Sequence, residues 1–278
     1  MIARTSMLAL FNRRFFDTED TVNFELAMDG LVKVRGFGLT LSTLFQPIVS
    51  TSSGRTLGWE GLVRPQDTMG AEVTPLAFLD RFPTGVAMAR ADRVCRSLHL
   101  ANFIGSAPED AYLFVNLHPR HLLSATDHGT TFAGIAAEGG LAASRIVCEV
   151  QEHAARDEMQ LVAAVKSFKS HGFLIALDGF GSGDESVQFD RLLELHPNIV
   201  KLHRQMLARR DPAHRYALTR LIRAVHQLGA TVVATGIETP DDAALALDAG
   251  ADMLQGYFVG RPHTQLLPGT APRSMSPF

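Results

Sequence analysis

The sequence has few cysteines, no long apolar run and no strong charge excess. Its two cysteines, Cys95 and Cys148, lie in apolar surroundings, so we expect buried, reduced thiols without a chemical role. No apolar stretch approaches the roughly 20 residues that a membrane helix needs. The short apolar segment at residues 7–11 is followed by no small-residue cleavage site. These absences predict a cytoplasmic protein without a membrane span.

Charge also excludes whole classes of partner. The formal net charge of the 278 residues is −3, and the lysines and arginines are scattered. A protein of this kind has no general attraction for nucleic acid or anionic lipid, so we expect no nucleic-acid partner. Any phosphate-bearing ligand must therefore be held by a local group of side chains.

The chain divides into three parts. Residues 1–38 form an N-terminal extension, and the spacing in TVNFELAMDGLVKV predicts helix there, which leaves a docking helix or a homodimer open. Residues 39–266 are expected to form the main domain, because barrels of about 250 residues commonly fold as one unit. Residues 267–278, rich in proline and serine, are expected to be a flexible tail.

Within the main domain, the first two apolar runs predict a hairpin. LFQPIVS and RTLGWEGLVR flank a turn that contains Gly54, so we expect two antiparallel strands. Short β-rich runs then alternate with amphipathic helical stretches, which predicts βα units around a parallel sheet. Gly172, Gly229 and Gly250 follow three of these helices and suit a left-handed cap, and Thr74 is the expected N-cap of another.

Polar side chains stand at successive strand ends. Because the carboxyl ends of barrel strands meet at one mouth, a closed barrel would gather them. Four of these side chains, the carboxylates of Glu60, Glu149 and Asp178 and the amide of Asn116, suit Mg²⁺ or Mn²⁺ rather than zinc. The set is Glu60, Asn116, Glu149, Asp178, Lys201, Glu238 and Gln255.

The motifs around these residues resemble those of one family. They occur in the order FQPIVS, WEGLVRP, FVNLHPRHLL, CEVQE, ALDGFGSG, VKLHR, TGIET and LQGYFVGRP. Each is weak alone, but together, from Phe45 to Pro262, the sequence resembles the EAL family of cyclic di-GMP phosphodiesterases. The resemblance implies an α/β fold, a TIM-like (β/α) barrel with one antiparallel strand near its start.

The resemblance also implies roles for individual residues. Glu60, Asn116, Glu149 and Asp178 would hold a first Mg²⁺ or Mn²⁺. Lys201 would stand beside the phosphate or the attacking water, and Glu238 would support the site as a vestigial catalytic residue. Contacts to cyclic di-GMP would come from Gln46, Leu62, Arg64 and Gln255.

Each assignment competes with an ordinary structural explanation. Taken singly, Asn116 is a turn former and Glu149 or Gln255 a solvated side chain at a strand end. Arg64 could make only a surface salt bridge. We interpret Trp59 as core packing, and Glu152 and His203 receive no role.

The sequence departs from the family pattern at the acids. Gly179 replaces the second carboxylate of an Asp-Asp pair, and Thr235 stands where active members have a Glu that serves as base or second-metal ligand. Loss of a positioned base costs roughly 10²- to 10⁴-fold in rate. Asp184 or Glu185 could act as surrogate ligands. His203 for Asp and Gly61 for Ala are further departures.

Three functional hypotheses follow. The leading one is a catalytically degenerate receptor or regulator that binds cyclic di-GMP and signals to a protein partner. The second is an active, metal-dependent phosphodiesterase that produces pGpG. The third is a protein-interaction module that no longer binds nucleotide. Retained Arg64 and Gln46 favour the first two hypotheses, and the missing acids favour the first over the second.

Overall fold

The structure is a computed structural model, and it describes residues 2–15, 21–82, 85–118, 129–151, 158–182 and 185–270. Glu152 and Asp184 lie outside the described residues, and the side chain of Glu185 is not described. The surrogate role proposed for the two acids of that loop therefore stays a prediction.

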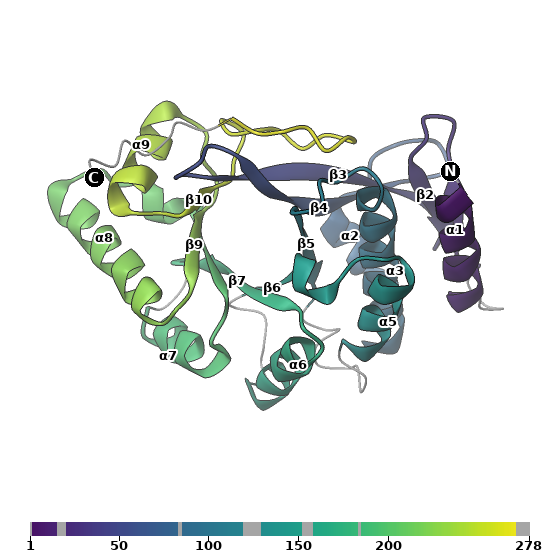
Figure 1. Cartoon of the computed structure of the whole chain (residues 1–278), viewed down its shortest axis with the longest axis horizontal. Coiled ribbons are helices and arrows are strands. Elements are labelled where there is room, and N and C mark those ends of the chain that lie inside the picture. Colours follow the sequence, from purple (N-terminus) through teal and green to yellow (C-terminus); the bar gives the residue numbers. More distant parts are fainter. Residues whose placement is uncertain are drawn as a thin grey trace.

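The strands from β3 to β10 close into a barrel (Figure 1). β3 pairs antiparallel with both β4 and β10, and each other neighbouring pair is parallel. The predicted TIM-like barrel with one antiparallel strand near its start is therefore confirmed. The strands are β3 (Leu39–Ser50), β4 (Thr56–Gln66), β5 (Tyr112–Leu117), β6 (Ile146–Gln151), β7 (Leu174–Phe180), β8 (Ile199–Leu202), β9 (Thr231–Ala234) and β10 (Met253–Leu254).

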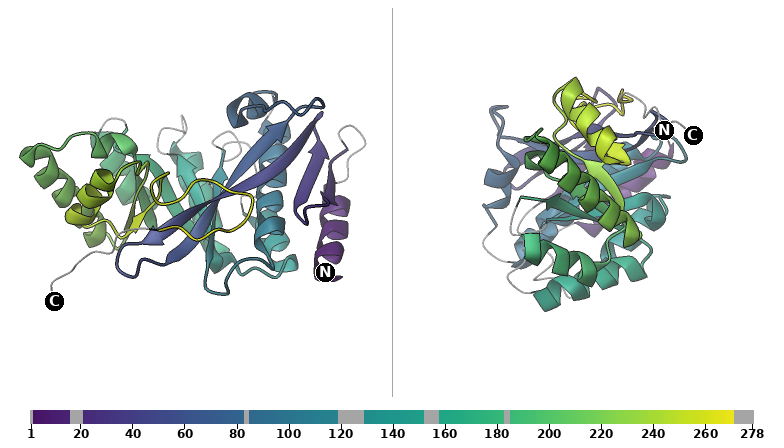
Figure 2. Two further views of the ribbon diagram at one scale, coloured as in Figure 1. Left: turned by 90° about the horizontal axis from the view of Figure 1, so that it is seen from above. Right: turned by 90° about the vertical axis from the view of Figure 1, so that its left-hand side faces the viewer.

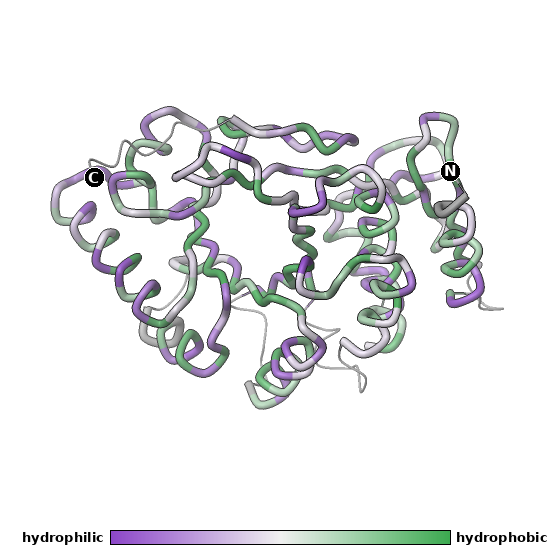
Figure 3. The backbone as a smooth tube through the Cα atoms, viewed as in Figure 1, coloured by the Kyte–Doolittle hydropathy of each residue, from purple (hydrophilic) through white to green (hydrophobic). Residues whose placement is uncertain are grey.

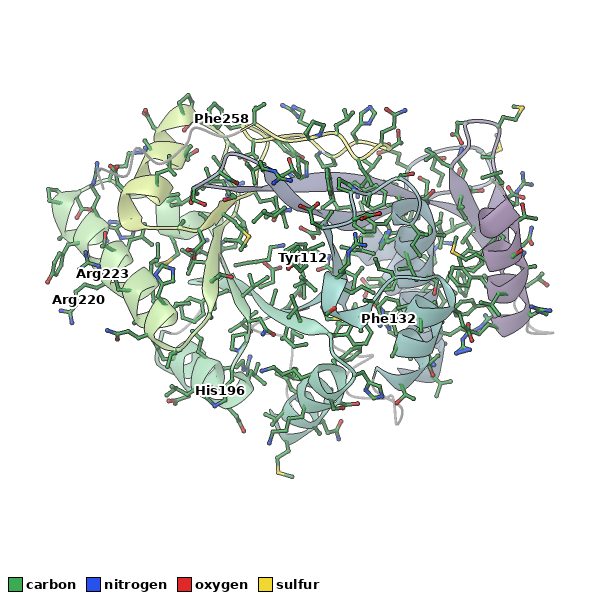
Figure 4. All side chains as sticks on the ribbon, in the orientation of Figure 1. Tyr112, Phe132, His196, Arg220, Arg223 and Phe258 are labelled. Atoms are coloured by element: carbon green, nitrogen blue, oxygen red, sulfur yellow. The ribbon has the colours of Figure 1, made fainter. Side chains whose placement is uncertain are left out.

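Helices lie on the outer face of the barrel, and the C-terminal segment lies along part of β3 (Figure 1). Figure 3 shows long hydrophobic stretches along the strands, whereas α8 alternates between apolar and polar residues, as a helix with one buried face must. A buried apolar cluster contains Phe114, Val147 and Val233, and Tyr112 packs against it (Figure 4). The helices are α2 (Pro75–Leu79), α3 (Gly85–Phe103), α5 (Thr130–Glu138), α6 (Glu158–Ser170), α7 (Glu185–Leu195), α8 (Pro212–Gln227) and α9 (Pro240–Ala249), with short 3-10 turns at Ala143–Arg145 and Arg204–Leu207.

The predicted helix boundaries are confirmed by their local geometry. Thr74 accepts a hydrogen bond from the amide of Ala77, and Pro75 opens α2. Gly172, Gly229 and Gly250 follow α6, α8 and α9 with φ of +88°, +80° and +96°. An L residue with a side chain would be strained there, so glycine ends these helices and turns the chain toward the next strand.

The N-terminal extension corrects one prediction. It forms α1 (Ile2–Arg14) and then two antiparallel strands, β1 (Asn23–Leu26) and β2 (Val32–Gly36), that continue the sheet beyond β3. The helix expected at residues 21–34 was therefore wrong. Buried residues alternate with more exposed ones along β2, and Gly30 takes a φ of +78° in the turn. This period of two and the turn glycine are the signals of a hairpin.

The C-terminal segment lies across the β3–β4 hairpin, as Figure 2 shows. We call residues 263–270 the C-terminal strap. His263 exchanges two backbone hydrogen bonds with Phe45, and the indole of buried Trp59 donates to the carbonyl of Leu267 at 2.8 Å. Residues 267–270, which were predicted to belong to the flexible tail, pack on the barrel, and residues 271–278 lie outside the described residues. Trp59 is a core residue, as predicted.

Two further expectations can be compared with the structure. Cys95 and Cys148 are free and buried, as predicted, and burial raises the pKa of the Cys148 thiol to about 12. Within the part of the chain that the structure describes, none of the helices has the length and apolar character that crossing a membrane requires.

Candidate functional site

The carboxyl ends of β4, β6 and β8 place one lysine between two glutamates. Lys201 Nζ lies 2.6 Å from Glu149 Oε1 and 3.0 Å from Glu60 Oε2. Lys201 is 2% exposed and Glu149 is fully buried. In the register of the parallel strands, Lys201 pairs with Asp178, whereas Glu149 pairs with Ala176, two residues earlier on β7. The tilt of barrel strands brings side chains with such an offset to one mouth.

Two amides complete the buried group. Asn116 Nδ2 donates to Glu60 Oε1 at 2.9 Å, and Gln255 Nε2 donates to Glu60 Oε2 at 2.7 Å. Glu60 thus accepts hydrogen bonds from three different side chains. We call Glu60, Asn116, Glu149, Lys201 and Gln255 the buried network. Each had been predicted to face the mouth, and the structure brings all of them together.

The charges of this network shift one another's pKa values. Burial raises the pKa of Glu60, but attraction by Lys201 and its three hydrogen bonds outweigh burial, so its pKa falls below the usual value. Burial and repulsion by Glu60 hold the pKa of Glu149 well above its ordinary range. Burial disfavours the charged form of Lys201, yet attraction by Glu149, Glu60 and Asp178 raises its pKa overall. The lysine therefore stays charged at neutral pH.

The other side of the mouth is less buried, and it has no acid at residues 179 and 235. Gly179 follows Asp178 in a bulge of β7, with φ of +83°. Thr235 Oγ1 donates to the carbonyl of Leu202 at 2.7 Å. Glu238 lies at the rim, 3.6 Å from Arg204, and its side chain is 56% exposed. We call Asp178, Gly179, Thr235 and Glu238 the open side.

Two cavities meet at Glu60 and Asp178. The first, about 240 Å³, we call the lysine cavity; its walls include Gln46, Lys201, Thr235, Glu238, Gln255 and Tyr257. The second, about 430 Å³, we call the arginine cavity; its walls include Leu62, Arg64, Asp92, Arg96, His99 and Asn116. Glu60 and Asp178 line both cavities, and we call the two cavities together the hollow.

The residues predicted to contact nucleotide divide between these cavities. Gln46 lines the lysine cavity and donates from Nε2 to the carbonyl of Gly260 at 3.2 Å. Leu62 and Arg64 line the arginine cavity, where Arg64 Nη1 donates to the carbonyl of Val63 at 2.9 Å. Gln255 is buried behind the lysine cavity. Their role in binding stays a prediction.

The donor set fits one hard divalent cation better than two. Glu149 Oε2 is buried and accepts no hydrogen bond from the described residues, as expected of an oxygen that awaits a cation. Yet among those residues no three acidic, histidine or cysteine side chains already converge as ion ligands, because Lys201 stands between the glutamates. Gly179 and Thr235 supply no carboxylate for a second ion.

Sequence reasoning missed several residues of the hollow. His99 is 4% exposed on α3, and its Nδ1 lies 2.9 Å from Thr43 Oγ1. Burial lowers its pKa to about 4, so the imidazole is neutral at pH 7. No motif marks His99, but Asp92 and Arg96, a buried ion pair of 3.0 Å on α3, are spaced by four residues, as helical ion pairs often are.

Known proteins share this sequence pattern. The EAL domain family matches residues 38–262. The chain is 26% identical over 233 residues to the probable cyclic di-GMP phosphodiesterase PdeG of Escherichia coli K12, which covers 80% of this chain and 44% of PdeG. It is 26% identical over 230 residues to the EAL-domain containing protein YkuI of Bacillus subtilis 168, covering 80% of this chain and 55% of YkuI.

Solved structures share the fold. YkuI in complex with its substrate c-di-GMP and calcium superposes with a TM-score of 0.70 at 25% identity, covering 82% of this chain and 57% of that chain. A manganese and cy-diGMP complex of Klebsiella pneumoniae BlrP1 gives 0.74 at 19% identity, covering 91% and 61%, and supports the fold alone. The chain spans about half the length of the curated relatives PdeG and YkuI. Its sequence and its barrel agree, and the chain belongs to the EAL domain family.

Proposed function

We propose that this chain binds cyclic di-GMP across the two cavities, hydrolyses it negligibly, and acts as a receptor or regulator. The observation that carries the proposal is the contrast between the intact buried network and the open side. The binding groups Gln46, Leu62 and Arg64 all line the hollow. Thr235 uses its hydroxyl on the carbonyl of Leu202, and a hydroxyl cannot take a proton from water near neutral pH.

Different side chains of the hollow would contact different parts of the nucleotide. Arg64 offers a guanidinium, whose planar fork suits a phosphate anion. Leu62 supplies apolar contact in the same cavity, and Gln46 offers an amide to a base edge in the other. Lys201 offsets one of the two carboxylate charges of Glu60 and Glu149, which reduces the repulsion of an anionic ligand at the mouth.

Glu60, Asn116, Glu149 and Asp178 would hold one Mg²⁺ or Mn²⁺. Such an ion would neutralise charge on a phosphoryl oxygen. Since Lys201 balances one of the two glutamates and the pKa of Glu149 is raised, we expect binding of the nucleotide to persist without added metal.

Calorimetry with cyclic di-GMP tests the proposal, in EDTA and in millimolar Mg²⁺. We expect a dissociation constant in the micromolar range or below in both buffers. Arg64→Met should weaken binding by about ten- to hundredfold, because a charge-assisted hydrogen bond is lost. Arg223→Met is the matched control: this arginine projects from α8 away from the barrel (Figure 4) and should not matter.

The alternatives have distinct signatures in the same samples. No heat of binding for the natural chain would favour the protein-interaction module. Rapid, metal-dependent formation of pGpG during the titration would identify an active phosphodiesterase. A loss equal in both arginine variants would remove Arg64 from the binding site.

A further inference from the structure

The side chain of His99 fills the space that a side chain at residue 61 would need. A methyl group built on Gly61 would lie 2.6 Å from Cγ of His99 and 2.9 Å from its Cβ and Cδ2. Such separations do not occur between real side chains. The backbone of Gly61 has no positive φ, so a methyl group there is excluded by the imidazole and not by the fold.

The imidazole is fixed in this place from the other side. His99 extends from α3 toward β3, where its Nδ1 lies 2.9 Å from the hydroxyl of Thr43. Thr43 pairs with Val63 across the β3–β4 ladder, two residues beyond Gly61. Both His99 and Thr43 are buried, so the ring sits against the two strands without freedom to swing out.

The position of this contact matters for ligand binding. Gly61 lies between Glu60 and Leu62 on β4, and Arg64 follows on the same strand. The backbone at residue 61 therefore sets where the carboxylate, the apolar contact and the guanidinium stand in the hollow. His99 also lines the arginine cavity together with Leu62 and Arg64.

We propose that His99 is a positioning residue for the binding site: its imidazole fills the room of a side chain at residue 61 and holds β4 in register with the cavity. The inference rests on the proposed function. It predicts that residues 61 and 99 are coupled, so that a larger residue at one requires a smaller residue at the other. Overpacking by one methyl should displace β4 and weaken binding by about tenfold.

The test uses Gly61→Ala, His99→Ala and the double variant. We expect each single variant to bind cyclic di-GMP more weakly by about tenfold, and the double to recover part of that loss. His99→Asn keeps Cβ, Cγ and a polar atom at the Nδ1 position, so it should retain most of the affinity. Gly134→Ala, on α5 where an added methyl meets only the flexible end of Arg14, is the control and should change nothing.

A second measurement tests the coupling of residues 61 and 99 without the ligand. Trp59 is the single tryptophan and lies on β4, two residues before Gly61. Its fluorescence emission therefore reports on this strand, both in the folded protein and during urea unfolding. We expect Gly61→Ala to shift both, and the double variant to reverse part of the shift. Natural emission and stability in Gly61→Ala would overturn the inference, as would a double variant no better than the weaker single. Failure of the natural chain to bind would instead remove the proposed function, while the coupling at β4 would still be measured.

Discussion

The two sides of the barrel mouth differ in burial and in the number of partners. In the buried network, Lys201 and Glu149 are almost inaccessible, and each charge touches an opposite charge or an amide. On the open side, Glu238 is more than half exposed and its contact with Arg204 is 3.6 Å long. Charges in the first setting depend on one another for stability, whereas charges in the second are supported by water. The comparison teaches that the fold depends on the buried half of the mouth more than on its open half.

The largest expected effect is on Lys201. Lys201→Met leaves Glu60 and Glu149 buried without their cation, which should cost about 3–5 kcal/mol of unfolding free energy. Urea unfolding measures this loss, with Arg204→Met on the open side as control. A loss below about 1 kcal/mol would contradict the dependence of the buried network on its lysine.

A pH titration of stability probes the buried side through His99. The pKa of His99 is about 4 in the folded chain, chiefly because burial disfavours the charged imidazole. The carboxylates of Asp92 and Glu60 raise this pKa, and the guanidinium groups of Arg64 and Arg96 lower it. The unfolded value is about 6.5. Because the pKa is lower in the folded chain, the neutral imidazole contributes to the free energy of unfolding. This contribution is complete above pH 6.5 and is lost as the pH falls toward 4, by at most about 3 kcal/mol.

The variant His99→Asn should remove this part of the pH dependence, whereas His196→Asn, at an exposed position with φ of +44°, should keep it. Urea unfolding between pH 7 and pH 4 makes the measurement. The same slope in both variants would show that another group is responsible.

Restoring acids to the open side should raise activity. We expect Gly179→Asp with Thr235→Glu to form pGpG at least about a hundredfold faster than the natural chain, and to require Mg²⁺ or Mn²⁺. Either change alone should recover little, because the two acids act as a unit. Chromatography over hours, with and without EDTA, separates the cases.

The matched control is Gly179→Asn with Thr235→Gln. Asparagine at residue 179 meets the same left-handed backbone as aspartate, with φ of +83°, but brings no charge. Equal activity of the charged and uncharged pairs, or rapid turnover by the natural chain, would refute the account of the missing acids.

The smallest effect should come from Glu238. Glu238→Gln breaks only an exposed contact with Arg204, so unfolding should change by about 0–1 kcal/mol. Nucleotide affinity should also stay unchanged, and calorimetry checks this. A tenfold loss of affinity would move Glu238 from the rim into the binding site.

Much of the fold could be predicted because its signals are local. The turn at Gly54 and the helix-ending glycines depend on neighbouring residues only. The extension was misread because the spacing of Val22 and Leu26 also fits a helix, while the alternation of Val22 and Phe24 that marks a strand is short.

The site was predictable at the level of which residues meet, and not of how they meet. Strand ends identified Glu60, Glu149 and Lys201, but the placement of the lysine between the glutamates depends on the register of distant strands. His99 was missed for the same reason. Nothing near residue 61 in the sequence indicates which helix packs over it.

The C-terminal strap has a consequence for how the chain folds. Its hydrogen bonds join Trp59 to Leu267 and Thr56 to Gly269, pairs separated by 208 and 213 positions. Such contacts close very long loops, and folding slows as the separation between partners grows. During synthesis, the outer face of the β3–β4 hairpin therefore stays uncovered until residues 263–270 have emerged. Until then Trp59 remains an apolar surface that a chaperone or a second nascent chain can bind.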